Sequence, residues 1–507
     1  MHSWGEVVEN CKDRRVAVMF ALGFSAGMPI MLIFSTLSLW LKEAELARSA
    51  ITMFSWAALG YAFKYIWAPL VDRMPTPVLT KMLGQRRSWL LISQFAIVIA
   101  ILGMAFTDPA YNLTSMAIFA VMLGFSSATQ DIVIDAYRIE IADDDFQAFL
   151  SSTYIAGYRV AMLAATTGAF LIAAGLGSTE ENYVYSAWSW TYMIMAALML
   201  VGIITTFLIS EPDRILNDED HAHSVADHAR FFLVFLLSAA MLILLYRSTG
   251  GVVADVKPVL SDMISKPLAK IIVETLRLIA SVGGAFLFGR LLLELNVASK
   301  PMVTNAYVGP IRDFFARYGK HALMILCMIA VYRSSDIIMG AIANVFYVDV
   351  GFTKVEIGLI AKGYGLAMTI IGSFAGGILA LRYGVMKILF AGAVITAASN
   401  VLFVLLANMP EPSLGMLTVV IAIDNFSAGI AVAAFVAYLS ALTSISFTAT
   451  QYALFSSIML LLPKLLAGYS GGMVDTVGYS SFFIGTAILG IPVALLVLYA
   501  AKVTKVE

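Results

Sequence analysis

The sequence predicts an all-α, polytopic membrane protein, and three observations support this fold class. Hydrophobic residues make up 60% of the 507 residues and charged residues 13%, whereas soluble domains are about half apolar and about a quarter charged. Apolar runs of about 20 residues, the length that an α-helix needs to cross a bilayer, recur along the whole chain. These runs form two blocks of six, with a more polar stretch between them. The lipid bilayer is therefore the solvent that we expect for this chain.

Each block of six runs predicts one bundle of six membrane-spanning helices. The first bundle occupies residues 1–210 and the second residues 321–507. Because the run near 16–41 is not followed by a small-residue cleavage site, we expect a retained helix and not a signal peptide. The expected spans lie near residues 16–41, 51–71, 88–107, 114–137, 147–175, 187–209, 321–348, 355–381, 386–407, 413–441, 449–470 and 479–501. Two similar blocks are typical of transporters built from repeated bundles.

The stretch between the bundles, residues 211–320, predicts a linker with a two-helix insert. It holds an apolar run from Phe231 to Tyr246 and a mixed run from Leu268 to Leu295. In the second run Arg277 and Arg290 flank the apolar centre, and long basic side chains can reach the two membrane surfaces. The alternative is an amphipathic helix that lies on the membrane surface. We expect two crossings, which gives 14 transmembrane helices in all.

The distribution of basic residues predicts the orientation of the chain. Lys and Arg concentrate in the loops that a 14-helix topology places in the cytoplasm when both termini are cytoplasmic, as at Arg86, Arg87, Arg230 and Lys300. Such loops carry an excess of positive charge in membrane proteins. We therefore expect both termini inside. The insert begins and ends on the same side, so it must cross twice or not at all.

The two blocks also repeat each other in sequence. The pairs Phe125-Ser126 and Ala136-Tyr137 recur with the same spacing as Phe426-Ser427 and Ala437-Tyr438. Ser151-Ser152 followed by Arg159 recurs as Ser456-Ser457 followed by Lys464. Repeats of this kind indicate two related bundles that face each other across a central cavity.

The informative residues are the ionisable ones inside the expected spans. A charge at the bilayer centre costs at least about 2.5–3.5 kcal/mol on insertion scales, so such residues are rare and usually functional. Five bases and four acids lie at this depth, which leaves a cationic surplus: Lys64, Asp131, Asp135, Arg159, Arg333, Asp336, Lys362, Asp424 and Lys464. Polar companions at similar depth are Gln130, Tyr158, Asn344 and Asn425. We expect substrate to contact Lys64, Arg333, Asp336, Lys362, Asp424 and Lys464 together with these four. The alternative is that the charges only pair with each other, as Arg333 and Asp336 could one turn apart.

Two acids on the fourth span are candidates for proton coupling. Asp131 and Asp135 are four residues apart and share one face of a helix, and their repeat positions in the second half are Val432 and Val436. Two nearby carboxylates in a low dielectric resist double ionisation, so one of them should bind a proton in the working pH range, while Arg159 would hold the other ionised. The alternative is a static pair between an acid and Arg159.

The loop after the second span carries a charged pattern that predicts a gate. Asp72-Arg73 is followed by Arg86-Arg87, and Arg382 lies at the corresponding place in the second half, within Gly377-xxx-Leu-Arg-Tyr-Gly384. The pattern resembles the loop signature of the major facilitator superfamily, with Ala68 where that signature has glycine. We expect these five charged residues to serve gating, although basic residues there also satisfy the positive-inside rule.

Other segments resemble a narrower group, the AmpG family of that superfamily. The matching segments are Gly23-Phe24-x-x-Gly27-x-Pro29, Phe63-Lys64-x-x-Trp67-x-Pro69, Gln130-Asp131-Ile132-Val133-x-Asp135, Gly157-Tyr158-Arg159, Asp336 and Ala449-Thr450-Gln451. The insert departs from the twelve-helix pattern of the family. Asp424 stands where the family has glutamate and Lys464 where it has arginine, which keeps the charge but loses bidentate binding of a carboxylate.

This resemblance implies a proton-driven permease of the bacterial inner membrane. Its substrates would be anhydro-muropeptides, disaccharide peptides that feed peptidoglycan recycling and the induction of β-lactamase. Protons would be the coupling ion, with no other cofactor, and we expect a monomer that binds no nucleic acid. The sequence shows no metal-ligand spacing and no catalytic constellation, which disfavours an enzyme. Two alternatives remain from the residues: a transporter of another large anionic metabolite, and a membrane sensor without transport.

Overall fold

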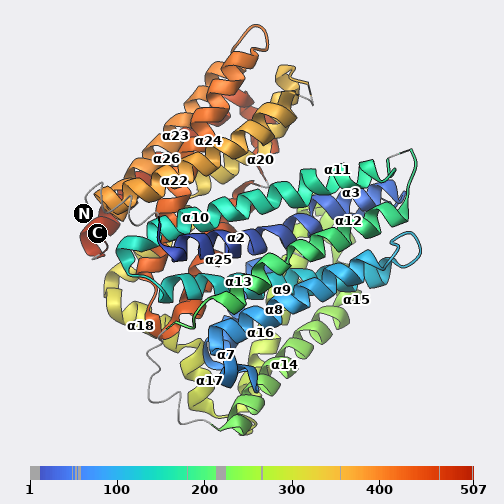
Figure 1. The fold of residues 1–507 in the computed structure, drawn as a ribbon, viewed down its shortest axis with the longest axis vertical. Helices are drawn as coiled ribbons and strands as arrows, with labels where there is room; N and C mark the ends of the chain where they lie inside the picture. Colours follow the sequence, from blue (N-terminus) through green and yellow to red (C-terminus); the bar gives the residue numbers. More distant parts are fainter. Residues whose placement is uncertain are drawn as a thin grey trace. The chain divides into compact units, whose positions relative to one another are not determined.

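The computed structural model describes residues 12–47, 50–51, 54, 57, 59–179, 181–212, 224–263, 266–353, 356–467, 469–504 and 506. Helices joined by short turns make up nearly all of this part of the chain (Figure 1). The chain folds into two compact units. The first comprises the described residues of Met1–Asp72, Thr76–Ile215 and Phe314–Glu507, and the second those of Arg73–Pro75 and Leu216–Asp313. Apart from Arg73–Pro75, both predicted bundles therefore belong to the first unit, and nearly all of the predicted insert forms the second.

The first half of the large unit contains helices that follow the predicted spans, several of them interrupted. In chain order they are α2 (Arg14–Ile33), α3 (Ser35–Glu43), α5 (Leu59–Phe63), the 3₁₀ turn η2 (Lys64–Ile66), α6 (Ala68–Arg73), α7 (Leu79–Leu83), α8 (Gln85–Ala105), α9 (Leu113–Glu140), α10 (Asp144–Leu163), the π-helical turn η3 (Ala164–Gly168), α11 (Ala169–Gly175), α12 (Tyr185–Leu198) and α13 (Leu200–Leu208).

The second half is built in the same way. Its elements are η5 (Gly319–His321), α19 (Ala322–Val331), α20 (Ser334–Val350), the π-helical turn η6 (Ile357–Tyr364), α22 (Gly365–Tyr383), α23 (Val385–Ala407), α24 (Leu414–Leu442), η7 (Ile445–Phe447), α25 (Thr448–Ala467) and α26 (Ser470–Val503). The sequence did not predict the interruptions, which divide six of the twelve expected spans in the two bundles: 16–41, 51–71, 147–175, 187–209, 321–348 and 355–381.

Within the described residues, 13 helices are long and apolar enough to cross a membrane. They include the run 225–248 and the run 272–294 of the predicted insert. The predicted span near 51–71 is not among them, because several of its residues lie outside the described part and the rest is broken by η2. The count of 14 therefore stays a prediction.

Glycines allow helices of the first half to pack backbone against backbone. A Cβ on Gly23 would lie 2.2 Å from the carbonyl oxygen of Tyr154, and one on Gly27 would lie 2.2 Å from that of Tyr158. Across the same contact, a Cβ on Gly157 would lie 2.0 Å from the oxygen of Phe20. Small residues of this kind let membrane helices approach closely. Gly23, Gly27 and Gly157, which belong to two of the AmpG-like segments, thus bring α2 against α10, which carries Tyr158 and Arg159.

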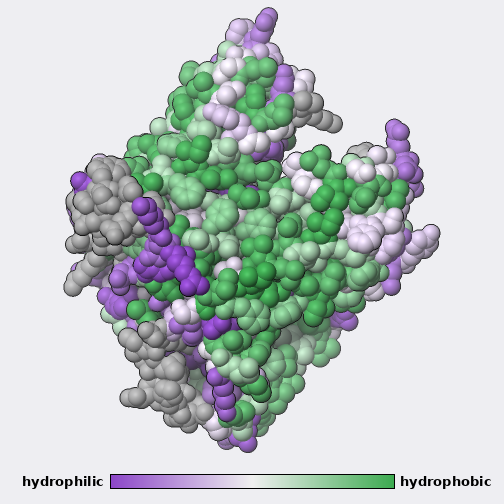
Figure 2. Space-filling model, viewed as in Figure 1, coloured by the Kyte–Doolittle hydropathy of each residue, from purple (hydrophilic) through white to green (hydrophobic). Residues whose placement is uncertain are grey.

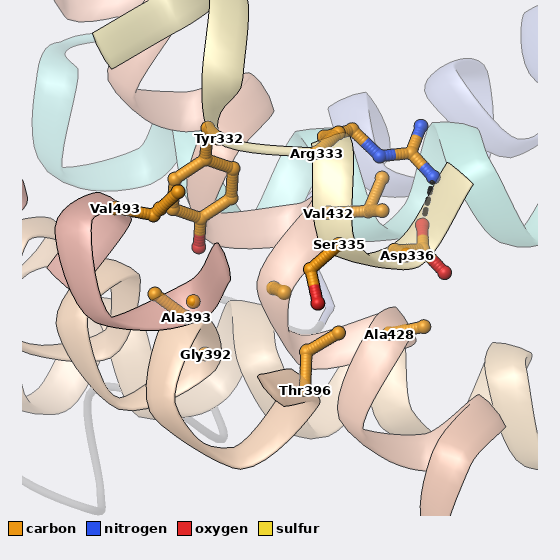
Figure 3. Close-up of a pocket in the computed structure, with 12 residues that line it drawn as sticks. Tyr332, Arg333, Ser335, Asp336, Gly392, Ala393, Thr396, Ala428, Val432 and Val493 are labelled. Atoms are coloured by element: carbon orange, nitrogen blue, oxygen red, sulfur yellow. Dashed lines mark hydrogen bonds and ion pairs between the residues drawn. The ribbon is translucent and has the colours of Figure 1, made fainter. Parts of the chain in front are cut away.

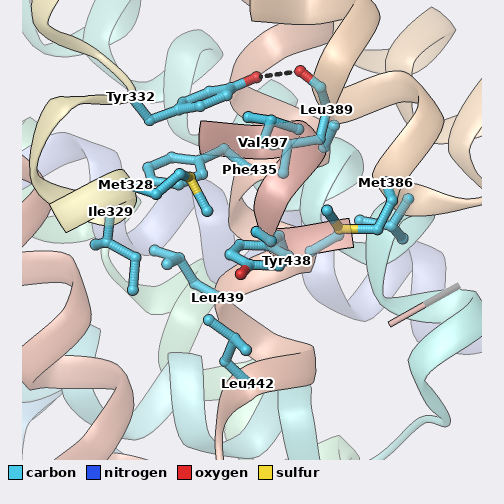
Figure 4. Packing of buried hydrophobic residues seen from close by; sticks show 14 of the residues in the cluster. Met328, Ile329, Tyr332, Met386, Leu389, Phe435, Tyr438, Leu439, Leu442 and Val497 are labelled. Atoms are coloured by element: carbon cyan, nitrogen blue, oxygen red, sulfur yellow. Dashed lines mark hydrogen bonds between the residues drawn. The ribbon is translucent and has the colours of Figure 1, made fainter. Parts of the chain in front are cut away.

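The second half has an apolar core around α24 (Figure 4). Tyr332 stacks on Phe435 with ring centroids 4.2 Å apart, and its hydroxyl donates a hydrogen bond of 2.9 Å to the carbonyl oxygen of Leu389. Met328, Leu439 and Val497 are fully buried beside them. This packing fixes the place where α19 ends and α20 begins, which is the position of Arg333.

The second unit contains three longer helices, α14 (Val225–Ser248), α15 (Gly250–Met263) and α16 (Lys266–Glu294), followed by the shorter α17 (Lys300–Tyr307) and α18 (Gly309–Tyr318), whose last residues belong to the first unit. The sequence did not predict α15. Arg277 on α16 lies 3.9 Å from the ring centroid of Tyr246 on α14, donates a hydrogen bond to the Tyr246 carbonyl oxygen and pairs with Glu274 at 3.2 Å. Its charge is thus neutralised within the unit and needs no aqueous surface.

Hydrophobic side chains cover most of the surface in the view of Figure 2, and hydrophilic ones gather at the ends of helices. Exposed Phe95 and Ile99 on α8, Leu171 on α11 and Leu495 on α26 are examples in the large unit. In water such a surface would be unfavourable. It is the surface expected of a protein surrounded by lipid.

Candidate transport site and gate

The first group of predicted site residues forms a cluster of charges between η2 and α9. The break at η2 brings Lys64 to α9, where its Nζ lies 3.6 Å from Oδ2 of Asp135. The other oxygen of Asp135 is 3.5 Å from Nη2 of Arg138. Lys64, Asp131 and Asp135 are each less than 10% exposed. Asp135 therefore lies between two bases in a site with little access to water.

Asp131, one turn earlier on α9, has no such partner. Its Oδ1 is buried and accepts no hydrogen bond among the described residues. The hydroxyl of Tyr61 is directed instead to Oγ of Ser127, at 2.6 Å. Gln130 accepts a hydrogen bond of 3.2 Å from Ser25, and its Nε2 has no acceptor in the described part of the chain. An unsatisfied buried oxygen is costly, and the charge of Lys64 also acts on Asp131, so Asp131 belongs to the same group as Lys64 and Asp135.

Arg159 does not pair with either acid in this structure, contrary to the expected arrangement. Its Nη1 contacts Sδ of Met162 at 3.8 Å, and Lys64 and Arg138 take the places beside Asp135. The groups that act electrostatically on Arg159 include Arg333 and Asp336 of the second half and Tyr158 beside it. Arg159 therefore belongs with the basic group of the second half, and the reason is that η2 places Lys64 nearer to the acids.

The second group surrounds Arg333, at the break between α19 and α20. Arg333 and Asp336 form an ion pair of 2.6 Å, and their side chains are 20% and 23% exposed. Figure 3 shows this pair beside a small hollow lined also by Tyr332, Ser335 and Thr396. The predicted alternative of an internal pair is thus realised here. The partial exposure leaves both side chains accessible to a ligand.

The remaining predicted residues of the second half differ in burial. Lys362, Lys464 and Asn344 are exposed, and the charge of Arg333 acts on Lys464. Asp424 is buried and accepts a hydrogen bond of 3.1 Å from Ser399. Asn425 accepts one of 3.0 Å from Thr369 and donates one of 3.0 Å to the carbonyl oxygen of Ile421. Among the described residues, no hydrogen bond joins these two amides to the two lysines.

The third group joins the two halves at one end of the large unit, and we call it the latch: Asp72, Arg86 and Glu140 with Thr448, Ala449 and Thr450. Asp72 accepts hydrogen bonds from the backbone N–H groups of Ala449 and Thr450, at 3.1 and 2.7 Å, and from the Thr450 hydroxyl at 2.6 Å. These groups begin α25, so a carboxylate of the first half caps a helix of the second.

Arg86 completes the latch. Its Nη2 is 3.0 Å from Asp72, 2.5 Å from Glu140 and 2.9 Å from the Thr448 hydroxyl. Thr448 also donates a hydrogen bond to Glu140. The side chain of Arg86 is fully buried. Two carboxylates around one guanidinium supply the compensation that a buried charge needs.

The other predicted gating residues lie outside the latch. Arg87 donates to the carbonyl oxygens of Thr206 and Phe207, both at 3.1 Å, and so binds the end of α13 in its own half. Glu211 accepts from the backbone N–H groups of Arg86 and Arg87 at 2.7 and 3.0 Å. Arg382 lies 5.5 Å from the ring centroid of its neighbour Tyr383, and Arg73 ends α6. The sequence did not identify Glu140, Glu211 or the threonines of α25 as site residues.

Comparison with known proteins gives the family. The model of the Major Facilitator Superfamily matches residues 16–299 and 324–507. The putative transporter AmpG 4 of Rickettsia felis is 30% identical over 495 residues, which is 98% of each chain. This chain belongs to the AmpG family of the major facilitator superfamily. The anhydromuropeptide permease of Escherichia coli K12 is 28% identical over 96% of this chain and 79% of its own.

Solved structures agree with this membership at the level of the fold. The fucose transporter FucP in the outward conformation superimposes with a TM-score of 0.61 at 11% identity, covering 96% of this chain and 98% of its own. The proton:xylose symporter XylE gives a TM-score of 0.60 at 12% identity, covering 98% and 96%. Membership of the family makes this chain a multi-pass membrane transporter.

The family motifs occupy the three groups described above. Lys64, Asp131 and Asp135 of the AmpG pattern form the acid cluster, and Asp72 with Thr450 forms part of the latch. At the two positions where this chain has a different residue of the same charge, Asp424 is buried against Ser399 and Lys464 is exposed. Within the described residues no group of three or more His, Cys, Asp or Glu could hold a metal ion.

Proposed function

We propose that this protein imports anhydro-muropeptides from the periplasm into the cytoplasm, driven by protons, for peptidoglycan recycling. The observation that carries the proposal is the similarity over 96% of the chain to an anhydromuropeptide permease. The site supports it, because the partly exposed bases suit a substrate with several carboxylates. The protein would act as a monomer in the inner membrane, and its import would support β-lactamase induction where that pathway exists.

The substrate would meet a basic surface formed by both halves. Arg159 and Arg333 interact electrostatically across the halves, and Arg333 also acts on Lys464. Lys362 is exposed on η6, and π-helical turns are frequent at functional sites. Carboxylates of a peptide would bind these bases, while Tyr158, Gln130, Asn344 and Asn425 would contact the sugars. Asp336 would keep Arg333 in place until a substrate carboxylate competes for it.

Protons, and no other cofactor, would couple transport to the membrane gradient. Asp131 and Asp135 are the acids, and Lys64 takes the place that we first assigned to Arg159. Lys64 and Arg138 are the bases beside these acids. The two charges of each sign balance only while both acids are ionised, so gain of one proton leaves a buried base uncompensated and rearranges the pairs. A change in these pairs would favour one facing state over the other.

The latch would close the cytoplasmic side. With both termini in the cytoplasm, the ends of α6 and α9 and the start of α25 lie on the inner side, where Asp72, Arg86 and Glu140 hold the halves together. The structure would then correspond to a state that admits substrate from the periplasm. Opening the latch would release substrate inside.

Uptake in cells tests the proposal directly. Bacteria that lack their own permease would express this protein and receive labelled GlcNAc-anhydroMurNAc-tripeptide at several external pH values. We expect accumulation above the external concentration, loss of it with a protonophore, and competition by unlabelled muropeptide. Uptake of another large anion without such competition would favour a different substrate, and binding without accumulation would indicate a sensor.

A further inference from the structure

Arg138, the third last residue of α9, lies between the acid cluster and the second half. It is fully buried, and its Nη2 is 3.5 Å from Oδ1 of Asp135. In its own half, Nη1 donates hydrogen bonds to Oε1 of Gln147 at 3.0 Å and to Oγ of Ser151 at 2.9 Å. Gln147 in turn donates to the carbonyl oxygen of Arg138 at 3.0 Å. The guanidinium is therefore fixed by α10 as well as by Asp135.

The same guanidinium also holds the second half. Nη1 donates a hydrogen bond of 2.7 Å to Oγ of Ser440 on α24, and Cζ lies 5.2 Å from the ring centroid of Tyr452 on α25. Arg138 thus contacts an acid of the cluster and two helices of the other half. Of the residues described above, Arg138 alone contacts both Asp135 and Ser440.

Asp135 is the acid that both Arg138 and Lys64 contact. The groups that face Asp135 are Lys64 on η2, Asp131 and Arg138 on its own helix, Tyr154 and Tyr158 on α10 and Tyr452 on α25. Only one of these groups, Asp131, is an acid. If a proton binds to Asp135, its charge no longer compensates the buried guanidinium, and an uncompensated buried charge is unfavourable. The guanidinium must then move towards water or another acceptor, which weakens its bonds to α24 and α25.

We propose that Arg138 transmits the protonation state of Asp135 to the contact between the two halves. The closed arrangement at this end requires an ionised Asp135, and protonation of Asp135 favours opening. The latch at Asp72 remains a separate contact, so protonation shifts the equilibrium and does not open this end by itself. This inference rests on the proposed proton coupling at the acid cluster, but it does not depend on which substrate is carried.

Two serines give a matched pair of variants. Ser440→Ala removes the bond from Arg138 to the second half, whereas Ser151→Ala removes a bond of similar length within the first half. Each hydroxyl also donates to the carbonyl oxygen four residues earlier in its own helix, so the two changes disturb their helices alike. Arg138→Gln, Arg138→Lys and Asp135→Asn complete the set.

The measurement is the distance between spin labels at Met82→Cys and Ile445→Cys, in purified protein in lipid nanodiscs without substrate. Met82 and Ile445 are 73% and 51% exposed, and along the chain they precede the latch residues Arg86 and Thr448 by one helical turn. Cys11→Ser and Cys327→Ser remove the native thiols. We expect the distance to lengthen as the pH falls, with a midpoint that Ser440→Ala moves to higher pH by about one unit, the lower end of what a hydrogen bond from a charged group contributes.

The other variants decide between coupling and a structural role. Ser151→Ala should move the midpoint less than Ser440→Ala. Arg138→Gln and Asp135→Asn should abolish the pH response, and Arg138→Lys should keep its direction. A distance in the parent protein that does not change with pH, or an unchanged pH response in Arg138→Gln, would overturn the proposal, as would equal shifts for the two serine variants. Failure of muropeptide uptake beside a normal pH response would reject only the substrate.

Discussion

At the scale of single residues, charge at membrane depth was the most useful signal in the sequence. It predicted Lys64, Asp135 and Arg333, each of which forms an ion pair in the structure. It could not predict the partners, because a broken helix at η2 and not helix periodicity brings Lys64 to Asp135. Comparison of the repeats would have found two residues that were missed: Arg138 and Glu140 stand where the second half has Leu439 and Ala441.

The latch gives the first prediction. Asp72→Asn weakens the cap of α25 and leaves Arg86 with one carboxylate, and removal of one partner from a buried ion pair costs about 3–5 kcal/mol. We expect the variant to favour the open form at this end, so that the distance between labels at positions 82 and 445 lengthens at neutral pH. Transport should slow because the closed form is less populated.

Arg87→Gln is the matched control for the latch. Arg87 neighbours Arg86 but binds carbonyl groups of its own half, so its loss should leave the label distance at the parent value. If Asp72→Asn inserts normally and both its label distance and its turnover equal those of the parent, the latch does not gate.

The basic residues of the second half give the second prediction. Replacing Arg333, Lys362 or Lys464 by glutamine should weaken uptake of a peptide-bearing muropeptide by about tenfold, since a hydrogen bond to a charged group contributes about 1.5–3 kcal/mol. Uptake of the peptide-free disaccharide should change little, because it lacks the peptide carboxylates. Initial rates over a range of concentrations provide the comparison. An equal loss for both substrates would mean that these bases do not bind the peptide.

At the scale of helices, the sequence predicted where the spans lie but not where they break. Hydropathy reports the mean character of about 20 residues and is insensitive to one turn of different geometry. Tyr332-Arg333 between α19 and α20, the 3₁₀ turn at Lys64 and the π-helical turn that carries Lys362 all occur inside apolar runs. In a membrane, such breaks are tolerated where protein or water satisfies the backbone. Three of the predicted site residues stand at these breaks.

Close packing of α2 against α10 gives the third prediction. Gly27→Ala would place a methyl group 2.2 Å from the carbonyl oxygen of Tyr158, and the two helices must separate to admit it. Overpacking of this kind costs about 1–3 kcal/mol. We therefore expect a lower melting temperature in detergent and reduced transport, since Tyr158 and Arg159 move with α10. Gly175→Ala, where a methyl group would meet nothing within 4 Å, should melt like the parent.

At the scale of the whole molecule, hydropathy and the positive-inside rule led to a 14-helix topology that the described residues leave open. The number of crossings in the insert matters most, since an odd number would place the second half upside down. The structure gives α14 and α16 the length and composition of membrane spans. The charge of Arg277 argued against a membrane span at α16, and its ion pair with Glu274 neutralises that charge. It also adds α15 between them, a helix with exposed Val252 and Val259 beside Lys257. An amphipathic connection of this type suits the surface of a membrane.

Reporter fusions test this topology and give the fourth prediction. Alkaline phosphatase, which is active only in the periplasm, and green fluorescent protein, which folds in the cytoplasm, would be fused in parallel after residues 224, 263, 299 and 507. If α14 and α16 both cross, phosphatase should be active only at 263, in the connection that contains α15, and fluorescence should appear at the other three sites. If the insert lies on the inner surface, all four sites should fluoresce, because Arg230 and Lys300 then belong to one cytoplasmic segment. Phosphatase activity at 299 and 507 would mean a single crossing. In that case the latch would face the periplasm in one half and the cytoplasm in the other, which its bonds between Asp72 and the start of α25 do not allow.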